Sequence, residues 1–288
     1  MTIFKEFAPA KVNLTLEVLG KRPDSYHELA SLVAFASAAA DEVTLDTSKP
    51  VGSSVSGPFG ATIAGQNLID VALAKISDAV PALRLGHVHL VKNLPVAAGI
   101  GGGSADAAAV LRIVRRANSD SAEHVNWLSI PRRLGADVAV CFGDTAAWMT
   151  GMGEQVKPIF DLPRLAAVLV NPLQPMPADK TAQVFRALNA PPLQNSYSAF
   201  TLPAPFTSVP VLLEYMAFTG NALEAAASAV APIIADVKTA LLTTGGCLYA
   251  AVSGGGPTCF GIFEDNQKAA TDIARQHPDW WVRAVTLG

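Results

Sequence analysis

The segment Pro95-Val96-Ala97-Ala98-Gly99-Ile100-Gly101-Gly102-Gly103-Ser104-Ala105 decides most of what this chain can be. The stretch before it, Gly86–Lys92, predicts a strand, and the Ala-, Leu- and Val-rich stretch that runs to about Ala117 predicts a helix. Ser104 stands where an N-cap belongs, with Asp106 in the first turn. Glycines let successive N–H groups turn toward one point, and a helix N-terminus adds about half a positive charge. The segment therefore predicts a phosphate cradle, in which the Ser104 hydroxyl could contact phosphate or a bound Mg²⁺.

Other phosphate-binding motifs do not fit this loop. A P-loop would need a lysine directly before Ser104, and a dinucleotide-binding motif would need glycine at that position. The His-Arg-Asp and Asp-Phe-Gly motifs of protein kinases are absent. The alternative to a phosphate-binding loop is a tight turn whose only role is to pack the following helix on the sheet. The run of three glycines followed by serine at a helix start favours phosphate binding.

The composition limits the class of protein around this loop. The chain has 288 residues, of which 50% are hydrophobic and 16% are charged, with a net charge of −3. This excludes intrinsic disorder, and the absence of a basic excess predicts no nucleic-acid partner. The length suggests two domains, for which we expect the ranges 1–155 and 156–288.

The sequence also argues against a membrane protein and a disulfide framework. Two long stretches lack charge, Ala187–Leu213 and Thr239–Phe263, but prolines interrupt the first and glycines the second. The N-terminus has no signal-peptide pattern, so we expect a cytoplasmic protein. The three cysteines form no CxxC pair, which makes a disulfide framework or a zinc site improbable.

Three further segments carry polar residues in suggestive places. Lys11 begins an alternating strand that we expect to continue to Val18, with Asn13 on the same face as Lys11. Asp137 lies among apolar neighbours, where an unpaired carboxylate is costly, and Lys11 is an available cation. A second glycine loop, Ser253–Thr258, lies between two expected strands and could alone be a hairpin turn.

The second half of the chain is expected to be mostly helical. Helices are predicted over residues 178–188, 209–218, 223–242 and 267–276, with strands over 165–170 and 281–287. Helices and strands interleave, which predicts layered α+β or α/β architecture.

These segments together resemble the GHMP kinase superfamily, which includes galactokinases, homoserine kinases and mevalonate kinases. Its three motifs match Ala8–Asn13, Pro95–Ala109 and Ser253–Thr258. The run Arg22-Pro23-Asp24-Ser25-Tyr26-His27-Glu28-Leu29 is similar to the branch whose acceptor is a cytidine-diphosphate-linked methylerythritol, in the non-mevalonate route to isoprenoid precursors. The resemblance spans most of the chain, although residues 190–235 contribute little. It implies an α+β, two-domain fold with the active site in the cleft between the domains.

The resemblance also implies a reaction and a set of site residues. The γ-phosphoryl group of ATP, accompanied by Mg²⁺, would pass to the 2-hydroxyl of the methylerythritol unit, with Asp137 as the base and Lys11 as its cationic partner. Residues 95–105 and Asn67 would bind ATP. The acceptor would be bound by Asn13, Tyr26, His27, Phe185, Gly254, Gly255 and Gly256.

The sequence departs from the family pattern at two positions and leaves alternatives open. Ala105 and Gly255 each stand where the motifs usually carry serine. Phe185 is also consistent with an ordinary core residue of its helix. The other functions considered are a different small-molecule GHMP kinase, such as a homoserine kinase, and a catalytically silent nucleotide-binding module. The aromatic pair at positions 26 and 27 favours a nucleobase site, and the presence of both Lys11 and Asp137 argues against a silent module.

Overall fold

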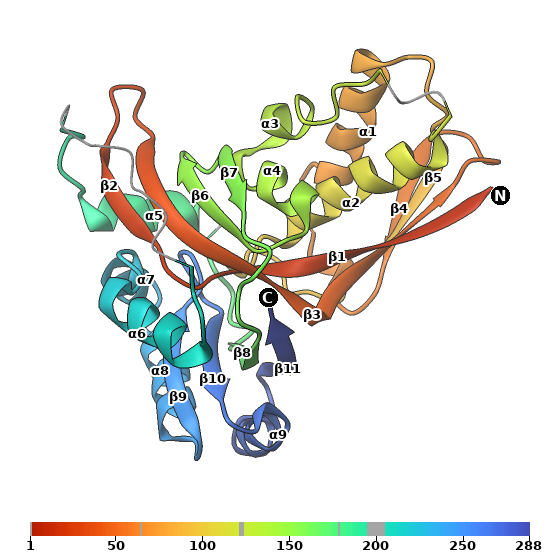
Figure 1. Cartoon of the computed structure of the whole chain (residues 1–288). Helices are drawn as coiled ribbons and strands as arrows, with labels where there is room; N and C mark the ends of the chain where they lie inside the picture. Colours follow the sequence, from red (N-terminus) through yellow and green to blue (C-terminus); the bar gives the residue numbers. More distant parts are fainter. Residues whose placement is uncertain (1, 64, 121–123, 178, 195–204) are drawn as a thin grey trace. The chain divides into compact units, whose positions relative to one another are not determined.

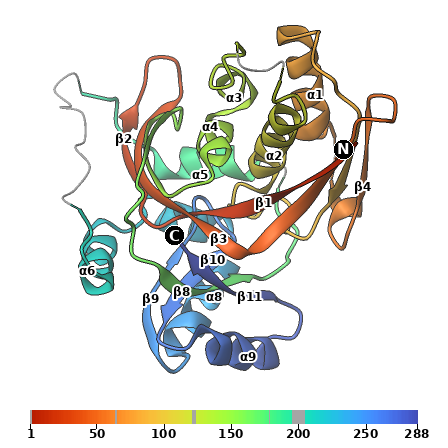
Figure 2. The ribbon, with the colours of Figure 1, turned by 45° about the vertical axis from the view of Figure 1, so that its right-hand side comes forward.

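The computed structural model describes residues 2–63, 65–120, 124–177, 179–194 and 205–288 (Figures 1 and 2). It confirms the α+β class and divides into two compact units. Unit 1 contains Met1–Ala10, Ala39–Val96 and Gly101–Asp144, and unit 2 contains Lys11–Ala38, Ala97–Ile100 and Thr145–Gly288. Each unit thus combines separate stretches of the chain. The domain boundary expected between residues 155 and 156 stays a prediction.

Unit 1 packs helices against a small group of strands. Strand β4 (Gly52–Ser56) pairs in parallel with β5 (His87–Val91), which pairs antiparallel with the C-terminal part of β3 (His27–Asp46). Figure 1 shows α1 (Leu68–Ala79) and α2 (Gly102–Ala117) near these strands, and α2 packs against both α1 and α4 (Ala136–Gly143). The elements of this unit also include η1 (Gly60–Thr62), α1 (Leu68–Ala79), α2 (Gly102–Ala117), α3 (Pro131–Leu134), α4 (Ala136–Gly143) and most of β1 (Ile3–Asn13).

Unit 2 is built on an antiparallel sheet in the order β3, β11 (Trp281–Leu287), β8 (Leu165–Asn171), β10 (Cys259–Phe263), β9 (Cys247–Val252), in which β3 contributes its N-terminal part. Side chains from alternate positions of four of these strands, such as Val168, Val170 and Val252, pack in one core cluster with α7, α8 and α9. The strands of this unit also include β2 (Glu17–Lys21), β6 (Ala147–Gly151), β7 (Gln155–Pro158), β8 (Leu165–Asn171), β9 (Cys247–Val252), β10 (Cys259–Phe263) and β11 (Trp281–Leu287). The helices are α5 (Lys180–Leu188), α6 (Val209–Thr219), α7 (Glu224–Val230), α8 (Ile233–Thr243) and α9 (Asn266–Gln276).

The structure confirms several predicted elements and corrects others. The strands at 165–170 and 281–287 are present as β8 and β11. The single helix expected over 223–242 is wrong, because the chain breaks at Ala231 and Pro232, whose ring removes a backbone donor. The strand expected to continue to Val18 ends at Asn13. The helix expected from Ala178 begins at Lys180, and Ala178 lies outside the described residues.

The structure also bears on membrane-spanning helices and on disulfide bonds. Among the described residues, no helix is both long and apolar enough to cross a lipid bilayer. None of the three cysteines, Cys141, Cys247 and Cys259, forms a disulfide bond within the chain.

Candidate active site

The two glycine loops meet in unit 2 although about 150 residues separate them in the sequence. The backbone N–H of Thr258 donates to the carbonyl of Ala98 at 3.1 Å, and the Ser253 hydroxyl donates to the carbonyl of Gly99 at 3.0 Å. Gly99 has φ +78°, and a Cβ there would lie 2.6 Å from the Gly256 carbonyl oxygen. The second loop is therefore more than a hairpin turn, because its backbone supports the first.

Lys11 and Asn13 anchor the end of β1 to this pair of loops. The N–H of Lys11 donates to the carbonyl of Ile100 at 2.9 Å, and the N–H of Asn13 donates to the Ser253 hydroxyl at 3.2 Å. The Asn13 side-chain amide donates to the Ser31 hydroxyl at 2.8 Å. Lys11 and Asn13 are both buried. All three sequence motifs thus contribute residues to one hydrogen-bonded junction within unit 2.

Two asparagines that the sequence analysis missed hold the second loop in place. The Asn171 amide donates to the Thr258 hydroxyl at 2.8 Å. The Asn221 amide donates to the carbonyls of Val252 and Gly254, at 2.9 Å each. Neither asparagine belongs to a motif. Their positions, at the end of β8 and in the turn before α7, gave no signal of this tertiary role.

We expect Gly99→Ala to lower the free energy of unfolding by about 2–5 kcal/mol. The left-handed backbone costs an L-residue about 1–2 kcal/mol, and crowding in a packed site adds about 1–3 kcal/mol. The crowding arises because the new methyl group would lie 2.6 Å and 2.7 Å from the carbonyl oxygens of Gly256 and Ser253. Urea denaturation measures the change.

Gly246→Ala is the matched control for this prediction. Gly246 has φ +81°, yet nothing lies within 4 Å of the position of its Cβ. This variant should therefore lower the free energy of unfolding only through the left-handed backbone, by about 1–2 kcal/mol. Equal losses of stability in the two variants would contradict the close contact between the loops.

In unit 1 the first loop continues directly into α2. Gly101, with φ 64°, is the N-cap, and the helix begins at Gly102. The expectation that Ser104 is the N-cap is wrong, because a glycine in the left-handed conformation starts the helix three residues earlier. Ser104 lies in the first turn and is partly exposed. Asp106, expected in the first turn, instead lies beyond it and is buried.

Asp106 belongs to a buried cluster of three charged groups below the start of α2. The Lys92 ammonium is 2.5 Å from Asp41 Oδ2 and 2.6 Å from Asp106 Oδ2. Asp41 Oδ1 also accepts from the N–H groups of Asn93 and Leu94. A Cβ on Gly102 would lie 3.1 Å from Lys92 Nζ, so the cluster lies directly against the glycine loop.

The cluster has one cation for two carboxylates, and this excess of negative charge affects the pKa values of Asp106 and Lys92. Burial raises the pKa of Asp106, whose Oδ1 has no hydrogen-bond partner among the described residues. Burial alone would lower the pKa of Lys92, but attraction to Asp106 and Asp41 raises it. Lys92 therefore stays charged at neutral pH, and Asp106 takes up a proton more readily than an ordinary aspartate does.

The remaining catalytic and nucleotide candidates of unit 1 lie at helix starts. Asp137 is partly buried in the first turn of α4, where the helix dipole favours a negative charge. The far end of α4 is tied to α2, because Arg112 Nη1 donates to the Cys141 carbonyl at 2.6 Å. Asn67 is the N-cap of α1, and its Oδ1 accepts from the N–H of Ile69. The pairing of Lys11 with Asp137 stays a prediction.

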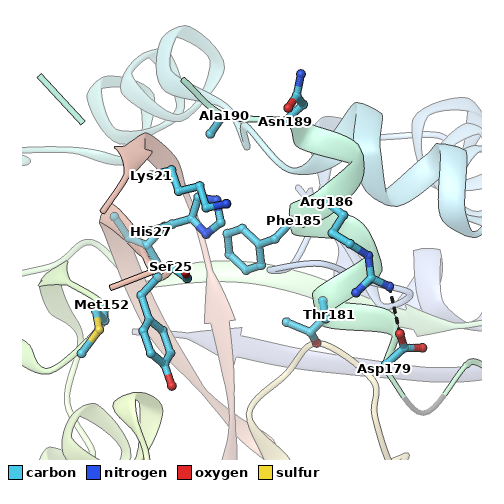
Figure 3. Close-up of a pocket in the computed structure, with 13 residues that line it drawn as sticks. Lys21, Ser25, His27, Met152, Asp179, Thr181, Phe185, Arg186, Asn189 and Ala190 are labelled. Atoms are coloured by element: carbon cyan, nitrogen blue, oxygen red, sulfur yellow. Dashed lines mark hydrogen bonds and ion pairs between the residues drawn. The ribbon is translucent and has the colours of Figure 1, made fainter. Parts of the chain in front are cut away.

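A pocket of about 750 Å³ in unit 2 brings together the three residues predicted to hold a nucleobase (Figure 3). His27 and Phe185 stack with ring centroids 4.6 Å apart and an interplanar angle of 21°. Tyr26 lines the same pocket and is 62% exposed. The other lining residues are Lys21, Ser25, Leu29, Met152, Asp179, Thr181, Ala182, Arg186, Asn189 and Ala190. Phe185 is therefore not only a core residue of its helix.

Both charged and aromatic side chains line the pocket. Arg186 forms an ion pair with Asp179 at 2.9 Å, visible in Figure 3, and both side chains are exposed. Burial and the nearby Lys21 lower the pKa of His27, which favours its neutral form at pH 7. Most of the residues that α5 contributes to the pocket could not be predicted from the sequence, because they match no motif.

The serine-to-glycine departure at Gly255 is not forced by packing. A Cβ at this position would meet the Val184 side chain at 3.7 Å, an ordinary van der Waals distance. Gly254 and Gly256, in contrast, have φ +54° and +65°. The conformation of the loop therefore requires glycine on either side of position 255 and tolerates other residues there.

Comparison with known proteins identifies the family to which these features belong. Residues 67–151 match the model of the GHMP kinases N terminal domain, and residues 209–282 match that of GHMP kinases C terminal. The chain is 46% identical to the 4-diphosphocytidyl-2-C-methyl-D-erythritol kinase of Methylobacterium radiotolerans, with 100% of both chains covered. It is 42% identical to the kinase of the same name from Bradyrhizobium diazoefficiens, with 96% of each covered.

Solved structures agree with this result. A crystal structure of 4-(cytidine 5'-diphospho)-2C-methyl-D-erythritol kinase superposes with a TM-score of 0.74 at 32% identity, covering 99% of both chains. A homoserine kinase from Cytophaga hutchinsonii superposes with a TM-score of 0.68 at 18% identity, covering 100% of this chain and 95% of the other. The second likeness shows the shared fold only.

Proposed function

Because the chain belongs to the 4-diphosphocytidyl-2-C-methyl-D-erythritol kinase family of the GHMP kinases, we propose that it transfers the γ-phosphoryl group of ATP to the 2-hydroxyl of 4-(cytidine 5'-diphospho)-2-C-methyl-D-erythritol. The bond between the γ-phosphorus and the β,γ-bridging oxygen breaks, and a bond to the hydroxyl oxygen forms. ADP leaves, and the hydroxyl proton passes to the Asp137 carboxylate. This step would belong to isoprenoid precursor biosynthesis in the cytoplasm.

The observation that carries this proposal is the meeting of Tyr26, His27 and Phe185 in one pocket. A cytosine needs a flat apolar face and hydrogen-bonding groups at its edge, and these three side chains supply both. Homoserine has no ring to stack. The pocket therefore favours the cytidyl acceptor over the homoserine-type alternative.

The roles of the other residues follow from positioning and electrostatics, which dominate phosphoryl transfer. The backbone of residues 95–105 would hold the ATP phosphates, with Asn67 near the adenosine. Lys11 would offset negative charge that develops on the transferring group. Asn13, Gly254, Gly255 and Gly256 would contact the acceptor.

Magnesium would enter with ATP. No group of three or more His, Cys, Asp or Glu side chains suited to a metal ion is found in the part of the chain that the structure describes. The Ser104 hydroxyl, partly exposed in the first turn of α2, is the protein oxygen we propose as a Mg²⁺ ligand. The chemical contribution of the magnesium ion would be to neutralise negative charge on the ATP phosphates.

Coupled measurement of ADP release with a panel of acceptors tests the proposed function. The panel contains the cytidyl compound, homoserine and mevalonate, each with ATP and Mg²⁺. We expect turnover with the cytidyl compound alone. Turnover with homoserine or mevalonate but not with the cytidyl compound would overturn the proposal, and no turnover with any acceptor would reopen the silent module.

We expect Tyr26→Ala to weaken use of the acceptor by about 5–150-fold while ATP affinity stays nearly constant. Stacking of a base on an aromatic ring contributes about 1–3 kcal/mol, and about 1.4 kcal/mol corresponds to tenfold. The ring is 62% exposed, whereas the turn itself is held by the Arg22–Glu28 ion pair and by the Tyr26 backbone. The melting temperature should therefore barely change. Apparent KM values for both substrates, with melting curves, measure the effect.

Tyr26→Phe is the control for this variant and should behave nearly as the wild type, since it keeps the ring face. An equal loss for ATP and acceptor that follows a loss of stability would show that Tyr26 only braces the turn. That result would count against the cytidine pocket without affecting the assignment to the family.

A further inference from the structure

Lys180, the first residue of α5, is a buried lysine that the proposed mechanism does not use. Its side chain is only 4% exposed. Its ammonium group donates to the carbonyl of Ala97 at 3.2 Å and to the carbonyl of Gly256. These carbonyls belong to the two glycine loops, so a single cation joins the two loops.

Within the described part of the chain, the contacts of Lys180 are with carbonyl groups and include no carboxylate. On α5, the neighbouring Asp179 is bonded to Gln183 and Arg186. On α7, which packs against α5, Glu224 is paired with Lys238 of α8. Among the described residues, no acidic side chain is bonded to Lys180. Burial accordingly lowers the pKa of Lys180 to about 8.

The second loop presents unused donors on the same stretch of backbone. The N–H groups of Gly254 and Gly255 donate to no acceptor in the described part of the chain. Gly254 has φ +54°, and consecutive N–H groups next to a left-handed residue form the kind of concavity that binds anions. The charge of Lys180 therefore lies close to backbone that suits an anion such as phosphate.

We propose that Lys180 is a positioning residue for nucleotide binding: its ammonium group fixes the segment 97–100 to the loop 253–257 and supplies the positive charge at their junction. This role rests on the proposed function, in which the same loops contact the phosphates and the acceptor. A neutral side chain without a donor, such as methionine, would fill the space but would leave both carbonyls without their charged hydrogen-bond donor, and hydrogen bonds from charged donors are the stronger ones.

Calorimetric titration with ATP alone, between about pH 6.5 and 9.5, tests the role of Lys180 without using the acceptor. For Lys180→Met we expect ATP affinity at pH 7 to fall by about tenfold or more, since 1.4 kcal/mol corresponds to tenfold. In the wild type, affinity should decline as the pH rises through about 8, where the lysine loses its proton. That decline should be absent in Lys180→Met and in Lys180→Arg, whose guanidinium stays charged.

Lys238→Met is the matched control, because Lys238 is a half-buried lysine of the same unit that is paired with Glu224 instead of with the loop carbonyls. It should keep the affinity and the pH profile of the wild type. Steady-state kinetics with the cytidyl acceptor should show a larger rise in KM for ATP than fall in kcat for Lys180→Met. Unchanged ATP affinity in a folded Lys180→Met, or the same alkaline decline in all variants, would overturn the proposal.

Two measurements distinguish a wrong role for Lys180 from a misfolded variant and from a wrong proposed function. If Lys180→Met does not fold, Lys180→Arg still tests the proposal, because an alkaline decline that persists in the arginine variant would contradict it. Stability gives an independent check. The unfolded chain keeps the lysine proton up to about pH 10.5, so the wild type should gain stability relative to Lys180→Arg as the pH rises from about 8 to 10.5. If no acceptor is phosphorylated, the proposed function fails while these ATP titrations still decide the role of Lys180.

Discussion

Asp137→Asn should lower kcat by about 10²–10⁴-fold, the usual contribution of a general base, while ATP affinity stays nearly constant. Asparagine has the shape of aspartate and keeps an acceptor oxygen, but it cannot take the hydroxyl proton. Asp137 lies in the first turn of α4, and the end of this helix is fixed to α2 by Arg112. The variant therefore changes the chemistry of the group with little change in its position. Single-turnover rates and ATP titration on the folded variant measure both quantities.

Asp144→Asn provides a control from the other end of the same helix. Asp144 is the C-cap of α4 with φ 48°, a conformation that asparagine also adopts readily. Its loss of charge should leave turnover near the wild-type value. If Asp137→Asn retained more than about a tenth of the wild-type rate, Asp137 would not be the base.

Lys92→Met should lower the free energy of unfolding by about 3–5 kcal/mol, because it leaves two buried carboxylates without their cation. Asp41 and Asp106 are 0% and 2% exposed, so water cannot replace the ammonium group. Asp106 can take up a proton, whereas Asp41 keeps only the two N–H groups of Asn93 and Leu94. A loss of this size is a large part of the total stability of an ordinary domain, about 5–15 kcal/mol. Urea denaturation followed by circular dichroism measures it.

Lys49→Met is the corresponding control in the same unit. Lys49 pairs with Asp46 at 3.4 Å, but its side chain is 62% exposed, and such pairs contribute about 0–1 kcal/mol. The double variant Lys92→Met/Asp106→Asn should recover part of the stability, since one unpaired carboxylate is removed. Similar small losses in Lys92→Met and Lys49→Met would show that the buried cluster does not stabilise unit 1.

The parts of this protein that follow from its sequence are those in which neighbouring residues determine the structure. The strand, glycine loop and helix around residues 95–105 are local, and they are present as β5, the loop and α2. The start of that helix was predicted at the wrong residue, because serine is the usual N-cap and a left-handed Gly101 replaces it here. The middle of β3 could not be predicted from alternation, since residues 30–36 are all buried.

The candidate site also combines features that could be predicted from the sequence with features that depend on distant contacts. Tyr26, His27 and Phe185 could be expected together through a family resemblance, whereas nothing in their spacing places residue 185 beside residue 27. Lys92, Lys180 and Asn221 act through contacts with segments far away in the chain. A lone lysine or asparagine in a sequence is most often a surface residue. The burial that gives these side chains their roles exists only in the folded chain.

If the cytosine of the acceptor binds in the pocket as proposed, the stacked pair of His27 and Phe185 means that it does not enter an open slot. Rings with centroids 4.6 Å apart leave no room for a base between them, so a cytosine that uses the covered face of Phe185 must first displace His27. An aromatic pair contributes about 0.5–1.5 kcal/mol, which would weaken acceptor binding by up to about tenfold relative to a pocket with separated rings. In the proposed site, the imidazole would thus compete with the incoming base for one aromatic surface. The His27→Ala variant would remove the stack that the base has to displace, which would raise acceptor affinity. It would also remove any polar contact between His27 and the base, which would lower acceptor affinity. The two contributions of His27 to acceptor affinity therefore have opposite signs.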